Sequence, residues 1–184
     1  NLERAKCDQL PGLVDEANKL LKAQTGLEDK LDNQRFIGHT VNDTVSQLLM
    51  LNELKLAEKI KSDFKVTDKA FAWLRVCALS KNRSWDELRQ YAGQKRLPLS
   101  IPHIVRIVKD EAGDERAKAL LSEEFVSNAD RITMYTELGM LAEAAQAAFA
   151  AKSMDSLRSL EALSVGREDV LKAIGNFKSR LVGK

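Results

Sequence analysis

Proline, glycine and cysteine are scarce in this sequence. Its 184 residues include three prolines, nine glycines and two cysteines. Because proline and glycine are the residues that most often interrupt regular elements, their scarcity favours long uninterrupted stretches of structure. Two cysteines as far apart as Cys7 and Cys77 cannot build a disulfide framework, so we expect both to be free thiols in a reducing compartment.

Several functional signatures are also missing. The net charge of +2 is small and gives no clustered basic face, which argues against a nucleic-acid partner. No apolar run reaches the 18 residues that a membrane-spanning helix needs, so we expect no direct membrane insertion. The sequence has no phosphate-binding loop, CxxC or HExxH motif, and its two histidines, His39 and His103, are typical of surface or capping positions. We therefore expect no cofactor, no metal site, no catalytic residues and no enzymatic activity.

What the sequence does contain is helix-forming. Hydrophobic residues make up 44% and charged residues 30%, with Ala, Leu, Glu, Lys and Arg prominent. Apolar residues recur at offsets of three and four, beginning with a stripe from Leu10 to Leu31. Thr40, Thr67 or Asp68, Ser100 and Ser153 are expected helix starts, and the alanine-rich segment from Met140 to Ala151 predicts a tightly packed helix. These patterns predict an all-α fold.

Turns recur along the chain, at Asn52, at 82–84, at Gly113 and at Gly139, with spacings of 26 to 32 residues. Such a period fits two short helices and their turns, and a single pair of this kind cannot bury its own apolar face. Stacked pairs can, so we expect one α-solenoid domain of stacked helical hairpins over residues 1–184, with a closed helical bundle as the alternative. The chain starts at Asn1 in helical sequence, and we expect it to be a fragment of a longer one.

The best-formed predicted unit runs from Phe64 to Tyr91 and holds both tryptophans. Residues 84–87 have the form of a capping box, and Gly93 is expected to end the helix in a left-handed conformation. We expect Trp73 and Trp85 to pack in the core rather than to form a ligand cage.

The same unit carries a family resemblance. The segment Phe64–Lys65–Val66–Thr67–Asp68–Lys69, then Trp73–Leu74 and Trp85–Asp86–Glu87–Leu88, resembles the C-terminal region of vacuolar protein sorting-associated protein 16. The resemblance extends to residues 27–31, 43–45 and 141–145, so that it covers most of the chain. No single motif among these is chemically diagnostic; their order along the chain carries the likeness.

The resemblance implies a function. The family is a shared core subunit of the HOPS and CORVET tethering complexes, with an α-solenoid C-terminal region. It implies a scaffold that docks an SM-family (syntaxin-binding) protein, vacuolar protein sorting-associated protein 33, and through it has an indirect link to SNARE proteins. Other core subunits would be further partners. The implied location is cytoplasmic, on the cytosolic face of late endosome and vacuole or lysosome membranes.

In this family docking uses the N-terminal part of the solenoid, here residues 1–92, whereas 93–184 would continue the solenoid. Carried over, the partner-binding residues are Leu13, Val14, Ala17, Asp68, Lys69, Ala70 and Trp73. The sequence departs from the family pattern at Thr67, where a proline is usual, and at Ala70, where a basic residue is usual. If the family's basic residue contacts the partner, that contact is missing here and would have to be replaced by one from Lys69 or by apolar packing.

Two other function classes were weighed. One is a peptide-binding adaptor of the tetratricopeptide type, in which Lys69, Arg75 and Arg89 would clamp a carboxylate. Their spacing follows no clear repeat. The other is an enzyme, for which the acidic pairs at 114–115 and 123–124 are the nearest candidates, although such pairs are typical of solvated helix faces.

Overall fold

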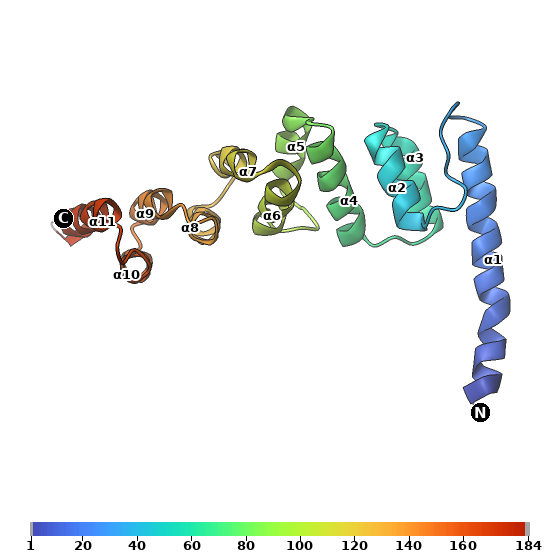
Figure 1. Cartoon of the computed structure of the whole chain (residues 1–184), viewed down its shortest axis with the longest axis horizontal. Coiled ribbons are helices and arrows are strands. Elements are labelled where there is room, and N and C mark those ends of the chain that lie inside the picture. The colour runs from blue at the N-terminus through green and yellow to red at the C-terminus, as the bar shows by residue number, and fades with distance from the viewer. Residues whose placement is uncertain (1, 183–184) are drawn as a thin grey trace. The chain divides into compact units, whose positions relative to one another are not determined.

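The computed structural model of the chain describes the backbone of residues 2–182 and the side chains of residues 12–182. Over this part the regular elements are eleven helices, with no strand, which confirms the all-α prediction (Figure 1). The helices are α1 Leu2–Glu28, α2 Val41–Met50, α3 Leu54–Asp63, α4 Asp68–Lys81, α5 Trp85–Ala92, α6 Ile101–Ala112, α7 Asp114–Leu121, α8 Asn128–Glu137, α9 Leu141–Ala150, α10 Met154–Leu163 and α11 Glu168–Val182.

Local capping chemistry sets several of the helix starts. The Thr40 hydroxyl accepts the Asp43 N–H at 3.2 Å and so caps α2. Ser153 caps α10 in the same way through the N–H of Ser156. The Thr67 hydroxyl accepts the Ala70 N–H at 3.3 Å in the first turn of α4. These starts agree with the predictions from the sequence.

Two predicted details around α5 are wrong. Ser84 makes no side-chain capping bond, because its ψ of 66° lies outside the extended region in which an N-cap hydroxyl reaches the helix amides. Gly93 has φ −78° and is not left-handed. Its small size serves a close approach instead, since a Cβ at this position would lie 3.3 Å from the ring of Phe125.

The chain divides into two compact units, Asn1–Ala78 and Leu79–Lys184, and each is described here by itself. The prediction of a single solenoid domain over 1–184 stays a prediction.

The first unit is built around one apolar core. Leu27 of α1, Phe36 of the following loop and residues from α2, α3 and α4 are all buried in it. One polar side chain ties α1 to its neighbours through two hydrogen bonds: the buried Gln24 donates to the Thr44 hydroxyl at 2.9 Å and to the His39 carbonyl at 2.8 Å. The core therefore holds only the C-terminal end of α1, while the N-terminal half of the helix runs past α2 and α3 (Figure 1).

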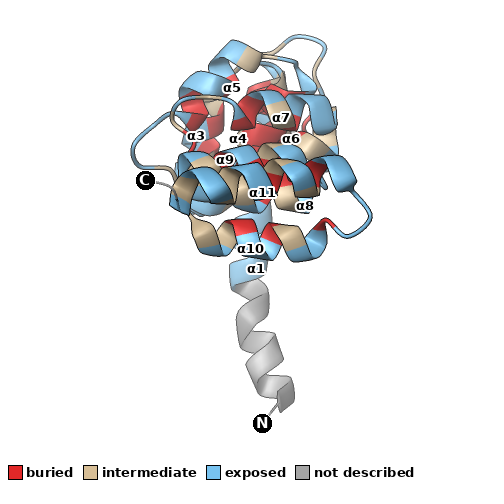
Figure 2. Ribbon diagram, turned by 90° about the vertical axis from the view of Figure 1, so that its left-hand side faces the viewer, coloured by how far each residue is buried: buried red, intermediate tan, exposed pale blue. Residues whose placement is uncertain are grey.

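The second unit packs its helices as hairpins, each against its neighbours in the sequence. α6 packs on α7, α8 on α9, and α9 on both α10 and α11. The middle of this unit is α9, whose small side chains let the neighbouring helices approach and are themselves buried, as predicted: Ala144, Ala145, Ala147 and Ala148. Figure 2 shows the buried stripe facing inward on α10 and the exposed residues facing out. Such neighbour-to-neighbour packing within the unit is that of the predicted solenoid.

Candidate partner-docking surface

The N-terminal half of α1 carries apolar side chains that no other part of the described chain covers. Leu13 is 61% and Val14 55% exposed, and Ala17 is exposed as well. The sequence predicts one continuous apolar stripe from Leu10 to Leu31, but burial of that stripe begins only near its C-terminal end, where Leu27 enters the core. The predicted docking residues on α1 are therefore all accessible.

Leu13 and Ala17 share a groove of about 400 Å³ with the turn between α3 and α4. Leu13 and Ala17 line it from α1, and Phe64 and Lys65 line it from the turn. Lys19 closes one side, with its ammonium 4.9 Å from the centroid of the Phe64 ring and a hydrogen bond to the Asp63 carbonyl. The apolar strip of α1 thus continues onto a ring supplied by another element.

Phe64 was not among the residues predicted for this surface. It ends the apolar pattern of α3, and an apolar residue in that place fits a core position as well as a groove. No sequence signal singles it out, because its place in the groove depends on the turn that follows, where Lys65 adopts φ 53° and redirects the chain.

The first turn of α4 holds the second group of predicted residues. The Asp68 carboxylate pairs with Lys61 at 2.6 Å, Lys69 is exposed, and Ala70 is half-buried. Lys65 lines both the groove beside α1 and a second shallow hollow formed with Lys61 and Asp68. The α3–α4 turn therefore lies between the two groups of predicted residues.

Trp73 lies further along α4 and is 50% exposed, so the prediction that it packs in the core is wrong. Phe71 and Leu74 on either side of it are buried, because they occupy the face of α4 that turns toward the core. Trp73 instead shares the outer face with Lys69, one helical turn earlier. It lines neither hollow beside the α3–α4 turn, so the contacts of the described residues do not join it to Leu13 or Ala17.

Trp85 is also outside the core, half-buried at the start of α5 with the Arg116 guanidinium 4.7 Å from its ring. Arg89, which the tetratricopeptide-type alternative would use to clamp a carboxylate, pairs with Asp86 and with Glu123 at 3.4 Å. The hydrogen bond to Asp86 is the main cause that raises the pKa of Arg89. Its guanidinium is thus already engaged by two carboxylates of the same unit.

No group of three or more His, Cys, Asp or Glu side chains within residues 12–182 is arranged to hold a metal ion. Cys77 is buried, and the side chain of Cys7 lies outside the described residues. In the described part of the chain, no helix has both the length and the apolar character needed to cross a bilayer.

Comparison with known proteins shows the family of this chain. Residues 2–179 match the sequence model of the family described as Vps16, C-terminal region. The vacuolar protein sorting-associated protein 16 homolog of Dictyostelium discoideum is 31% identical over 168 residues, 91% of this chain and 20% of that protein. Protein VACUOLELESS1 of Arabidopsis thaliana is 34% identical over 136 residues, 73% of this chain and 16% of that protein.

The probable vacuolar protein sorting-associated protein 16 homolog of Schizosaccharomyces pombe is 32% identical over 144 residues, 77% of this chain and 17% of that protein. The chain thus spans a fifth or less of the length of these relatives. Since the family model covers nearly the whole sequence, the resemblance predicted from residues 64–74 and 85–88 is confirmed: the chain belongs to the Vps16 C-terminal region family.

Proposed function

We propose that this chain is a non-enzymatic scaffold in a vacuolar protein sorting complex that tethers membranes, and that it recruits an SM-family (syntaxin-binding) protein for SNARE-mediated fusion. The observation that carries the proposal is the uncovered apolar strip of α1, Leu13, Val14 and Ala17, beside the groove lined by Phe64. The names of the relatives, which refer to vacuolar protein sorting, support the setting.

The strip has the chemistry of an interface core. Leu13 and Val14 offer apolar area to a partner, and burying such area is worth about 25 cal/mol per Å². Ala17 has almost no side chain, so a partner backbone can approach α1 closely there. Lys19 and Lys65 line the groove beside the strip and supply charges there, as polar rims do around apolar interface centres, while Asp68 and Lys69 are exposed in the first turn of α4.

The partner implied by the family is vacuolar protein sorting-associated protein 33, which would link the chain indirectly to SNARE proteins. Other core subunits of the HOPS and CORVET complexes would bind elsewhere on the assembly. The location that follows is peripheral, on the cytosolic face of late endosome and vacuole or lysosome membranes. Cofactors and nucleic acid have no part in this proposal.

Co-purification with the SM-family partner tests the surface. Ala17→Asp places a carboxylate on the strip, and Lys69→Glu reverses an exposed charge in the first turn of α4. An unpaired charge in a desolvated interface costs several kcal/mol, so Ala17→Asp should abolish capture of the partner. Both positions are exposed, so the far-ultraviolet circular dichroism of each variant should match that of the unchanged chain.

Two matched controls carry the same chemical changes in the second unit. Ala142→Asp and Lys172→Glu alter exposed residues of α9 and α11, and both should leave capture of the partner intact. Normal capture by Ala17→Asp and Lys69→Glu together would exclude this surface as the docking site. Loss of capture by the controls as well would show a general effect of charge and would count equally against it.

A further inference from the structure

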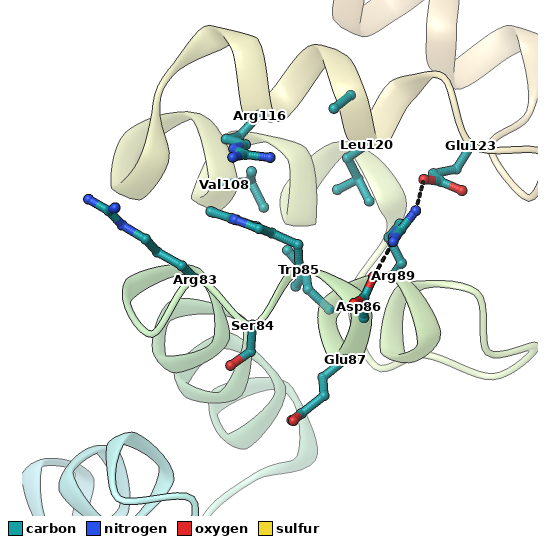
Figure 3. A pocket seen from close by; sticks show the side chains of 12 residues that line it. Arg83, Ser84, Trp85, Asp86, Glu87, Arg89, Val108, Arg116, Leu120 and Glu123 are labelled. Carbon is teal, nitrogen blue, oxygen red and sulfur yellow. Dashed lines mark hydrogen bonds and ion pairs between the residues drawn. The ribbon is translucent and has the colours of Figure 1, made fainter.

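The second unit holds a pocket that the proposed docking surface does not use. It has a volume of about 470 Å³ and lies between α5 and the α6–α7 hairpin, all within residues 83–123 (Figure 3). Its floor is apolar, formed by Leu88, Val108 and Leu120, which are almost fully buried. One wall is the indole of Trp85.

The charges around this pocket are separated. At one end Arg89 is held between Asp86 and Glu123, so positive and negative charge balance there. Figure 3 shows the side chain of Glu87 turned away from the cavity. The carboxylates near the pocket are therefore either paired with Arg89 or directed elsewhere.

At the other end two guanidinium groups accompany the tryptophan. Arg116 from α7 lies over the Trp85 ring at 4.7 Å, and Arg83 from the turn before α5 lines the same pocket, with its guanidinium group extending outward (Figure 3). Neither arginine makes an ion pair with another residue in 12–182, and both are exposed. Two guanidinium groups without paired carboxylates, near an indole and an apolar floor, form a site that can recognise a ligand with both an anionic and an apolar group.

We propose that this pocket binds a short peptide segment of a partner protein in which an acidic side chain stands next to a large apolar one. The carboxylate binds to Arg83 and Arg116, and the apolar side chain packs on Trp85 over Leu88 and Leu120. The site is separate in sequence from Leu13–Ala17 and Asp68–Trp73, so it adds a second contact to the scaffold and does not depend on the first.

The charge pattern favours a peptide over a phosphate-rich ligand. A multiply charged phosphate group would meet only two uncompensated cations, with the carboxylates of Asp86 and Glu123 at the far end of the same cavity. It would also leave the apolar floor unused. A peptide with one or two carboxylates followed by leucine or phenylalanine uses both the charged end and the floor, which is why we place a peptide here.

Tryptophan fluorescence provides a direct test. In a Trp73→Phe background Trp85 becomes the only tryptophan, so its emission reports on the pocket. The probe is the capped peptide acetyl-Gly-Glu-Glu-Leu-Phe-Gly-amide, titrated into the 184-residue chain at low salt. We expect saturable binding with a Kd on the order of 10–500 μM, a range suited to a short flexible ligand. Arg83→Gln and Arg116→Gln should each weaken it roughly fivefold or more, since each removes a charge-assisted hydrogen bond.

Matched probes and a matched variant decide the outcome. Arg96→Gln removes an exposed arginine that does not line the pocket and should leave the Kd unchanged. The same peptide with both glutamates changed to glutamine should bind roughly tenfold more weakly. Inorganic phosphate and vesicles containing a phosphoinositide should give no saturable change in the emission of Trp85.

Four results would overturn the proposal. These are no saturation by the acidic peptide, equal affinity for its glutamine version, an equal loss with Arg96→Gln, or a saturable response to phosphate or vesicles in place of the peptide. Circular dichroism checks that each variant is folded. Since Arg83 and Arg116 are both exposed, we expect both variants to fold, and if one of them were misfolded the other would still test the proposal.

Discussion

The Glu28 carboxylate accepts the backbone N–H of Phe36 at 2.6 Å, and the same oxygen accepts that of Ile37 at 2.9 Å. This contact fixes the loop after α1 against the end of the helix. Phe36 is fully buried in the core of the first unit, so the loop that Glu28 holds also delivers one of the largest core side chains. The Glu28 carboxylate thus adds a charged contact to the Gln24 hydrogen bonds and the Leu27 packing that hold the end of α1.

The first prediction concerns pH. The N–H groups of Ile37 and Phe36 hold the pKa of Glu28 below its ordinary value, and the nearby charges of Arg35 and His39 act in the same direction. A depressed carboxyl pKa means that the stabilisation is present above the unfolded-state pKa and is lost as pH falls through the folded-state value.

Amide chemical shifts measured against pH check this prediction. The N–H resonances of Phe36 and Ile37 should move together as Glu28 takes up its proton, and Glu28→Gln should remove that titration. Retention of the same pH dependence in Glu28→Gln would mean that another group is responsible.

The second prediction compares two glycines. Gly139 follows α8 with φ 71°, a conformation that costs other residues roughly 1–2 kcal/mol, so Gly139→Ala should destabilise the chain by about that amount. Gly175 lies inside α11 with nothing near the place of a Cβ, and Gly175→Ala should stabilise the chain by roughly 0.5–1 kcal/mol. Urea unfolding of the two variants checks both signs, and two changes of the same sign would contradict the argument.

The third prediction concerns the ion pair between α6 and α8. Arg106 Nε and Nη2 donate to the two oxygens of Glu137 at 2.8 and 2.7 Å, and this hydrogen bonding lowers the pKa of Glu137. Since both side chains are 42% exposed, water screens the pair, and Glu137→Gln should cost less than about 1 kcal/mol.

Phe36→Ala is the reference variant for this comparison, because removing a buried ring lowers the free energy of unfolding by roughly 3–5 kcal/mol. A loss from Glu137→Gln as large as that from Phe36→Ala, measured by urea unfolding, would show that the pair is shielded from solvent in a way its exposure does not indicate.

The sequence predicts a structural feature when the contacts that produce it lie close together in the chain. The starts of α2 and α10 follow from Thr40 and Ser153, whose hydroxyls reach amides three residues on, so both could be predicted. The conformation of Gly93 could not, because the ring that approaches it belongs to Phe125, more than thirty residues later. The capping prediction for Ser84 failed for a local reason instead, since the turn before α5, in which Arg83 has φ 57°, sets the backbone angles of Ser84.

The proposed docking surface, too, can be predicted from the sequence only in part. The spacing of Leu13 and Ala17 is continuous with that of Leu27, so the sequence identifies an apolar face of α1. It does not show which part of that face other helices bury. Only the packing of α2 and α3 shows that Leu27 is buried and Leu13 is not. The part played by Phe64 depends on a turn that brings it beside Lys19, and this long-range contact leaves no pattern in the sequence.

The last prediction concerns Trp73. Replacing a buried tryptophan by alanine lowers the free energy of unfolding by roughly 3–5 kcal/mol. Because Trp73 is half exposed, Trp73→Ala should lower it by much less. Large exposed aromatic side chains are frequent interface hot spots, so Trp73→Ala should weaken capture of the SM-family partner at least tenfold while urea unfolding changes little. Leu74→Ala is the matched control, because Leu74 is buried one position later and should lower stability more than Trp73→Ala does. If Trp73→Ala destabilised the chain as much as Leu74→Ala and left partner capture unchanged, Trp73 would have a structural role and α4 would contribute to docking only through its first turn.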